Sequence, residues 1–589
     1  MMGFICGGIF ILIISFLTFL PSFNLALFGD DWLAFFRYAM HVAPKLPGEW
    51  INLRYFLTPY GAQDILMGLL KSLFGFHSSY YYQISFILRL FAAFSLYPLV
   101  FYLTKDKLAT LFSILFFSIT VIGLDATNWV FNMPSYITIG LFNFVLYFFI
   151  KSREENQFKQ FFLAALFYYL AYIITPIRMH GSLPFLFLLD FFWIIQKKDF
   201  KIFKKAAIRL SIIFTIFLFI KFSGQSLGPS SEIPERLNQG FTISTQLLQN
   251  GRIDFIFHPF IMLGSMFLPD FVIQQMTGVS DINFSTLFFS ILSLFFFLII
   301  CLLLANASKA ISKKFFLKFL FFSLIWLLIS WIFFPKNIQP FPNNTITPAT
   351  SFILLNIGGF TIILLALLLK ENWRREKLST ALFISLVWPI LAFFAAWWFT
   401  PQVIFPTTYR YLIISAVGIS IILAIIINLS EEFKHKLILT VALSLFLILH
   451  IISTNHYLKL MENFHSQEIT DKIWSSLPYI PEVGKEPLVF YFEGDNSNYI
   501  ILHNVITFGF PPHMQILYHL TEKDYAPVPM QNWAEVISAI SDGQSFKAYG
   551  YPLEPMPVNN VYAFRLEGKD NLINITDLAR QKLFEEQRK

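Results

Sequence analysis

Charged residues are scarce in this sequence. Asp, Glu, Lys and Arg make up 13% of its 589 residues, whereas hydrophobic residues make up 56%. Ordinary water-soluble domains carry about 25% charged residues, so this composition excludes that class of protein. The net charge of +7 comes from Lys and Arg in short loops between apolar runs, which indicates membrane topology rather than a nucleic-acid-binding surface.

Cysteine is nearly absent. Cys6 and Cys301 both lie in apolar segments and are far apart in the chain. This excludes a disulfide framework and a cysteine-based metal motif.

Long apolar runs are abundant, and they contain most of the 74 Phe residues. Runs of about 18 to 23 apolar residues are long enough, as helices, to cross the hydrocarbon core of a bilayer. Helices are expected because lipid offers the backbone no hydrogen-bond partners. We therefore predict an α-helical polytopic membrane protein with about 13 transmembrane helices, at residues 4–21, 82–104, 108–124, 135–150, 161–175, 182–195, 206–222, 284–304, 315–334, 352–369, 378–399, 412–429 and 437–453.

The loops predict an orientation. Residues 1–20 lack the basic start and small-residue cleavage site of a secretory signal, so we expect a retained first span. Basic residues gather in alternate loops, which by the positive-inside rule are cytoplasmic, together with the N-terminus. We thus expect an integral plasma (inner) membrane protein whose remaining loops and C-terminal tail are extracytoplasmic. The basic loops lie at 105–107, 151–159, 197–205, 309–314, 370–377 and 434–436.

Two domains are expected, a multi-span domain at residues 1–454 and a tail domain at 455–589. The tail is richer in charge and proline, with strand-like runs at 488–492 and 561–566 and helical patterns at 533–540 and from Thr576, a candidate cap, to the end. It contains no nucleophile elbow, phosphate-binding glycine loop or metal spacing. We interpret it as a small α/β domain that has a structural role or docks an acceptor.

Two neighbouring acids, Asp30 and Asp31, follow the first span in the sequence Phe28-Gly29-Asp30-Asp31-Trp32. Adjacent carboxylates at a low-dielectric surface repel each other, which favours a proton-abstracting base, and they can also share a divalent ion. The alternative is that both acids cap a short helix and stay hydrated.

The next two outer loops add Asp125 with Trp129, and Arg178 with His180. A guanidinium at the outer face suits a phosphate-bearing lipid, because its fork matches phosphate oxygens. Helix capping remains the alternative for Asp125, and interfacial anchoring remains the alternative for Arg178 and His180.

Three further charges are candidates. Arg410, in a later outer loop, is expected either to contact a phosphate or to anchor the chain at the interface. Arg89 and Asp190 lie inside predicted spans, where charges are functional candidates by default. They are expected to pair with each other, or Arg89 lines the path of a lipid phosphate. The outer stretch 223–283, with its apolar patch at 255–268, is expected to form a lid over the site or a flexible connector.

These motifs resemble the GT-C superfamily of integral-membrane glycosyltransferases, in particular its protein O-mannosyltransferase-like and aminoarabinose-transferase-like branches. The resemblance rests on the Asp30-Asp31 pair after the first span, Asp125 with Trp129 after the third, and Tyr409-Arg410-Tyr411-Leu412 opening a late span. It covers residues 1–224 well and later helices less well, and it does not extend to the tail.

The resemblance implies transfer of a sugar from a polyprenyl-phosphate donor to an acceptor hydroxyl of a protein, lipid or glycan on the extracytoplasmic face. Asp30 would deprotonate the acceptor, Asp31 would orient it or help to hold a metal, and Asp125 would line the acceptor groove. Arg178 is assigned to the donor phosphate on charge and position alone, with His180 as a lesser candidate. No cofactor is certain, and a divalent metal is left open because the sequence shows no acidic metal cage. The sugar, the acceptor, the stereochemical outcome and the oligomeric state are not indicated.

Two other classes of protein fit a many-helix chain with few charges. One is a transporter or flippase of a lipid-linked or small solute, which typically has midplane sites on interrupted helices. The other is a non-catalytic cell-envelope assembly protein that acts through its tail. The polar residues gather at outer helix ends, which favours the transferase.

Overall fold

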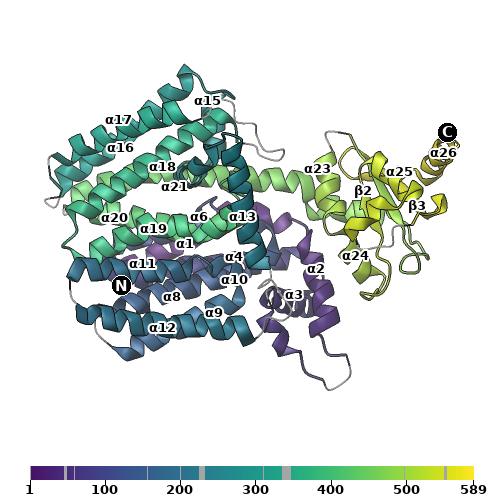
Figure 1. Ribbon diagram of the computed structural model, residues 1–589, viewed down its shortest axis with the longest axis horizontal. Coiled ribbons are helices and arrows are strands. Elements are labelled where there is room, and N and C mark those ends of the chain that lie inside the picture. Colours follow the sequence, from purple (N-terminus) through teal and green to yellow (C-terminus); the bar gives the residue numbers. More distant parts are fainter. Residues whose placement is uncertain are drawn as a thin grey trace.

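The protein consists of a large helical bundle with a smaller α/β domain at one end, joined by the long helix α21 (Figure 1). The computed structural model describes residues 2–45, 49–58, 60–154, 157–198, 200–223, 232–308, 311–312, 314–334, 346–430, 432–495, 498–549 and 554–588. The predicted class, a polytopic helical membrane protein with a small α/β domain, is confirmed. We call the end of the bundle that carries the α/β domain the domain end, and the other the distal end.

All thirteen predicted spans fall on helices, but fewer are long and apolar enough to cross a membrane. The described residues contain 10 such segments, or up to 11 when a bent pair is added. Three of the predicted spans, at 108–124, 161–175 and 206–222, are not among these segments. The helices of the first two are only 13 and 17 residues long, whereas a crossing needs about 20. The bundle comprises α1(Met2–Phe19), η1(Leu20–Asn24), α4(Ser78–Phe94), α5(Leu96–Thr104), α6(Lys107–Ile119), α8(Pro134–Glu154), α9(Phe158–Ile174), α11(Ser182–Lys197), α12(Phe200–Ser223), α16(Phe284–Ala307), α17(Lys314–Phe333), α18(Pro348–Glu371), α19(Glu376–Phe399), η6(Arg410–Ser415), α20(Ala416–Asn428) and α21(Phe433–His465).

Shorter helices connect these spans. Two of them, α14(His258–Phe267) with the preceding η5(Asp254–Phe257), and α15(Asp270–Thr277), form the pair that is bent by 84°. The others are α2(Asp30–Arg37), η2(Tyr38–Val42), η3(Leu53–Leu57), α3(Gly61–Phe74), α7(Asp125–Asn128), η4(Val130–Asn132), α10(Pro176–Met179) and α13(Glu232–Gln249).

The apolar patch at 255–268 belongs to the bundle, which corrects the expectation of a lid. A Cβ atom on Gly264 would lie 1.9 Å from the backbone oxygen of Leu354, so α14 and α18 touch along their backbones. Ile261, Met262 and Met266 of α14 are fully buried. A helix packed this closely is a fixed part of the core.

Helix α21 continues past residue 454, the predicted boundary between the two domains, to His465. The sheet of the tail domain has the strand order β2-β1-β3-β4, with β1 parallel to β2 and β3, and β4 antiparallel to β3. The predicted strands and helices are confirmed, whereas Thr576 does not cap the last helix: its hydroxyl bonds the backbone of Ala563 instead. The elements are α22(Gln467–Ser475), β1(Val489–Glu493), α23(Tyr499–Leu502), η7(His503–Thr507), α24(Phe510–Leu517), β2(Val528–Met530), α25(Trp533–Ser541), η8(Gln544–Tyr549), η9(Val558–Asn560), β3(Val561–Glu567), β4(Asn571–Asn574) and α26(Thr576–Gln587).

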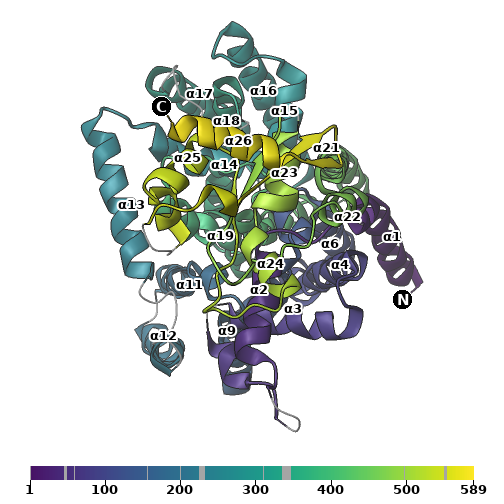
Figure 2. The ribbon, with the colours of Figure 1, turned by 90° about the vertical axis from the view of Figure 1, so that its right-hand side faces the viewer.

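The tail domain packs on the segment that follows α1 and η1, and α24 lies against α2 (Figure 2). The Ala26 N–H donates to the His465 carbonyl at 3.0 Å, and the Gly29 N–H donates to the Phe508 carbonyl at 3.2 Å. Gly29 has φ +60°, and a Cβ there would lie 2.0 Å from the Phe508 ring. Only glycine allows both this backbone conformation and this close approach.

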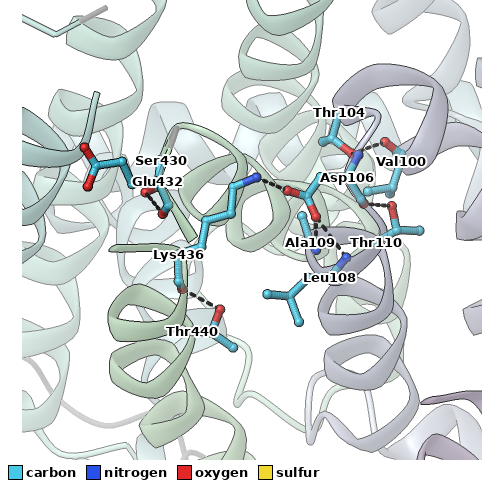
Figure 3. A network of polar contacts seen from close by, with 10 residues as sticks. All are labelled: Val100, Thr104, Asp106, Leu108, Ala109, Thr110, Ser430, Glu432, Lys436 and Thr440. Carbon is cyan, nitrogen blue, oxygen red and sulfur yellow. Dashed lines mark hydrogen bonds and ion pairs between the residues drawn. The ribbon is translucent and has the colours of Figure 1, made fainter. Parts of the chain in front are cut away.

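At the distal end, an ion pair joins the starts of two helices (Figure 3). The Asp106 carboxylate caps α6 by accepting from the N–H groups of Leu108 and Ala109, at 2.9 and 3.1 Å. Its other oxygen accepts from Lys436 on the first turn of α21. The contact therefore fixes the distance between these two helices where they emerge from the bundle.

Candidate functional site

Asp31 holds two loops together through its carboxylate. One oxygen accepts from the Phe28 N–H at 3.0 Å and the other accepts from the Phe131 N–H at 2.8 Å. The side chain is fully buried, and burial raises the pKa of the carboxyl to about 8 although both N–H groups act to lower it. Asp31 thus joins the loop before α2 to the segment before α8, so its placement favours a positioning role over contact with an acceptor or a metal.

Asp30 is the exposed member of the pair. It opens α2 and is partly accessible, and no hydrogen bond to its carboxylate is found within the described part of the chain. Burial raises the pKa of the Asp30 carboxyl, while the nearby Arg37 and Arg410 guanidinium groups act to lower it. A carboxylate with a raised pKa and open oxygens suits proton abstraction.

Asp125 lies on α7, which is hydrogen-bonded to the loop at residues 400–409. The Gly123 and Asp125 N–H groups donate to the carbonyls of Thr407 and Thr408, at 2.8 and 2.9 Å. Burial raises the pKa of the Asp125 carboxyl to about 7, whereas Arg410 and the Thr408 hydroxyl act to lower it. Asp125, the predicted second acid, therefore gains or loses its proton near neutral pH.

Arg410 lies near both carboxylates, close enough to lower the pKa of each. Its guanidinium carbon is 4.6 Å from the centre of the Trp129 ring and 5.3 and 5.4 Å from those of Tyr409 and Tyr411. Cation–π contacts of this kind fix a guanidinium without using its N–H donors. We call Asp30, Asp125 and Arg410 the acid–arginine cluster.

Two buried donors beside the cluster have no acceptor among the described residues. They are the Trp129 indole N–H and one terminal nitrogen of Arg178, Nη1. Arg178 lies with its guanidinium carbon 3.9 Å from the Tyr411 ring, and its other nitrogens donate to Ser135 and Asn132 at 3.2 and 3.3 Å. Buried donors are normally paired, so both groups are candidates for binding a polar ligand.

His180 directly follows α10, which carries Arg178, and is partly buried. Asp30, Asp125, Trp129 and Arg178 thus all lie near Arg410, with His180 two residues beyond Arg178.

Asp270 also belongs to this region, and the sequence analysis missed it. It opens α15 directly after the bend and is fully buried. One carboxylate oxygen accepts from the Thr407 hydroxyl at 2.5 Å, and the other accepts from the Tyr457 hydroxyl at 3.4 Å. The only sequence signal was an acid in Leu268-Pro269-Asp270, at the end of an apolar run.

Arg89 links the end of α6 to α7 through hydrogen bonds and does not line a lipid path. Its guanidinium donates to the backbone oxygens of Ser118 and Phe117, at 3.0 and 3.4 Å, and to that of Thr120. It also donates to the Thr127 hydroxyl on α7 at 2.9 Å. Because the side chain is fully buried and faces the carbonyl end of α6, we assign it a positioning role and not the substrate contact expected from the sequence.

Asp190 does not pair with Arg89. Its Oδ1 atom lies 2.9 Å from Arg153 and 3.5 Å from Arg209, both toward the distal end. The sequence analysis also missed a bidentate pair at the domain end, in which Arg37 donates twice to Asp64 at 2.7 Å.

A metal site was left open by the sequence. Among the described residues, no group of three or more His, Cys, Asp or Glu side chains is placed to hold a metal ion. The oxygens of Asp31 and Asp270 already accept hydrogen bonds, so the residues present do not form a metal cage, and we derive no step through a metal.

A scan against protein-family models finds no match, and neither does a search of curated proteins. Among solved structures, the chain is similar to an oligosaccharyltransferase from Archaeoglobus fulgidus in complex with Zn and sulfate, with a TM-score of 0.42 and 16% identity over 95% of this chain and 67% of that one. It is likewise similar to the oligosaccharyltransferase AglB from Archaeoglobus fulgidus in complex with an inhibitory peptide and a dolichol-phosphate, with a TM-score of 0.45 and 14% identity over 95% of this chain and 69% of that one. Because TM-scores below 0.5 do not establish chemistry, we base the functional conclusion on the site itself.

Proposed function

We propose that the protein is a membrane glycosyltransferase that moves a sugar from a polyprenyl-phosphate donor to an acceptor hydroxyl. The observation that supports this most is the acid–arginine cluster, in which one guanidinium lies near two carboxylates of raised pKa at the end of a membrane bundle. A base for the incoming hydroxyl and a cation for the leaving phosphate are the two groups that such a transfer needs.

In the proposed step, the Asp30 carboxylate takes the proton of the acceptor hydroxyl. The acceptor oxygen forms a bond to the anomeric carbon of the sugar, and the bond from that carbon to the phosphate oxygen breaks. The electron pair of the broken bond stays with the phosphate, which leaves on the lipid. Asp125 orients the acceptor hydroxyl.

Positive charge for the leaving phosphate comes from Arg410 and Arg178, which pack on the same Tyr411 ring. A guanidinium fork can donate two hydrogen bonds to phosphate oxygens, and it does so more strongly in a site with little water. The unpaired indole N–H of Trp129 is a further donor, to phosphate or to a sugar hydroxyl.

An apolar cavity of about 220 Å³ between α15, α16, α18 and α21 suits a prenyl chain. Leu268 and Ile273, which flank the buried Asp270, line it together with Phe289 and Leu445. Asp270 in turn bonds Thr407, whose neighbour Thr408 holds Asp125. The cavity is therefore joined to the acid–arginine cluster by a short series of direct contacts.

The acceptor is proposed to enter between the bundle and the tail domain, at the extracytoplasmic face of the plasma (inner) membrane. Trp32 of α2 stacks on His513 of α24, with ring centres 3.6 Å apart, so the bundle and the tail domain are in contact close to Asp30. A protein, a lipid or a glycan can supply the hydroxyl.

The test is sugar release by the purified full-length chain from a panel of polyprenyl-phosphate sugars, with and without a divalent cation. Asp30→Asn removes the base and keeps the shape of the side chain, so we expect turnover to fall by about 10²–10⁴-fold. Asp281→Asn is the matched control, because Asp281 is an exposed acid in a loop outside the cluster.

Loss of turnover in Asp30→Asn alone, with unchanged thermal stability, supports the proposal. Equal turnover in both variants would refute the role of Asp30. Donor binding without turnover for any sugar would instead favour a transporter of the same lipid.

A further inference from the structure

A second cavity, which is polar, lies at the distal end of the bundle and is about 460 Å³ in volume. α8 begins beside the site at Pro134, and its 21 residues place Glu154, which lines this cavity, roughly 30 Å away. It is formed where α8, α11, α12 and α19 converge, and none of its lining residues belongs to the proposed transferase site. The lining residues that carry charge are Arg153, Glu154, Lys197, Lys205, Arg209, Glu376 and Lys377.

The cavity carries an excess of positive charge. Five basic side chains line it against two acidic ones, and the buried Asp190 beneath them adds a third carboxylate. Asp190 is shared by Arg153 and Arg209, at 2.9 and 3.5 Å. One carboxylate cannot satisfy the donors of two guanidinium groups.

The two arginines are fixed and retain unused donors. Their side chains are 9% and 12% exposed, and the Arg153 guanidinium carbon lies 4.0 Å from the Trp193 ring. Within the described residues, Nη2 of Arg153 and Nε of Arg209 have no acceptor. Fixed guanidinium groups with open donors match the geometry of phosphate oxygens.

We propose that this distal cavity binds a phosphate group, carried by an acidic phospholipid headgroup or free in solution. Its polar lining and its place at the basic end of the bundle suit the headgroup depth of a membrane leaflet. Lys197 and Lys377, each about 39% exposed and paired with Glu376 and Glu154, form its mouth.

Binding is measured on the full-length protein by native mass spectrometry after exchange into phosphatidylglycerol, or into a galactosyl diacylglycerol that lacks phosphate. Thermal stability with inorganic phosphate, against chloride at equal ionic strength, is the arm for the free ion. The variant is Lys197→Gln, Lys205→Gln and Lys377→Gln combined, and we expect it to weaken phosphate-group binding by about a hundredfold.

The matched control removes the same charge from the same end, outside the cavity, with Lys107→Gln, Lys370→Gln and Lys434→Gln combined. These three lysines are exposed and do not line the cavity. Arg209→Lys is a separate variant that keeps the charge beside Asp190 but loses the fork.

The site is assigned to a headgroup if the protein retains phosphatidylglycerol but does not respond to inorganic phosphate, and if the cavity variant and Arg209→Lys lose this lipid while the control keeps it. The same pattern with inorganic phosphate shows that the phosphate group alone is sufficient. Equal binding by the cavity variant and its control, or equal binding of the galactolipid, overturns the proposal.

Discussion

Replacing Arg410 by Gln should slow sugar transfer by roughly 10²–10³-fold, because removing one preorganised group that stabilises developing charge costs about 3–4 kcal/mol. The guanidinium is held against the rings of Trp129, Tyr409 and Tyr411, at 4.6, 5.3 and 5.4 Å, so its position is set before substrate binds. Arg410→Lys restores the charge but not the planar fork, and we expect it to recover only part of the rate.

The same substitution should also move the pH profile. Arg410 lowers the pKa of the Asp30 and Asp125 carboxyls, so its removal raises both values. A base is active when ionised, above its pKa, and the rising limb of the rate therefore shifts to higher pH.

The assay is the initial rate of polyprenyl-phosphate release between pH 5 and 9, about two units on either side of the pKa of about 7 given for Asp125. Folding is checked by thermal unfolding of each variant. An Arg410→Gln protein that is folded, fast and unchanged in its pH profile would refute this reading of the cluster.

Three further predictions concern stability. Asp31→Asn should lower the free energy of unfolding by about 1–3 kcal/mol because one of two buried N–H donors loses its acceptor. Wild-type stability should also fall as pH rises from the ordinary pKa of 3.8 to the folded pKa of about 8 and should level off above it, because only the unfolded state has lost the proton in that range; thermal unfolding of the variant should lack this dependence. Arg89→Met should lower the free energy of unfolding by about 3–5 kcal/mol, because buried carbonyl groups lose their donor and α7 loses a contact that holds it in place. We expect a lower melting temperature and reduced turnover; a normal melting temperature with normal turnover would contradict this role. Asp106→Ala should lower the free energy of unfolding by about 0.5–2 kcal/mol, because α6 loses its helix cap. Turnover should be unchanged because Asp106 lies at the distal end, and a loss of turnover at full stability would contradict this.

The spans and the tail could be predicted from the sequence because their signals are local. An apolar run long enough to cross a bilayer defines its own helix, and strand β1 and helix α25 fall close to where the sequence pattern placed them. Helix ends were less certain, as α21 shows, since its last turns are polar enough to look like a separate domain.

The contacts that build the site are not local, and the sequence could not supply them. Asp270 meets Thr407 across 137 positions, and Asp31 meets Phe131 across 100. Nothing in the neighbourhood of Asp31 indicates that both its oxygens are occupied, whereas Asp30 beside it stays open. The acids could be nominated from their place at helix ends, but only tertiary packing separates the candidate base from the positioning residue.

Double substitution of Asp30 and Arg410 tests the central claim most directly. If the two residues serve one reacting centre, their effects on the rate should not be independent. The kcat/KM of the double variant, Asp30→Asn with Arg410→Gln, should then exceed the value obtained by multiplying the two single-variant losses, with a coupling free energy of about 1 kcal/mol or more. Losses that simply multiply, with all variants folded, would mean that the two groups act independently and would contradict a shared site.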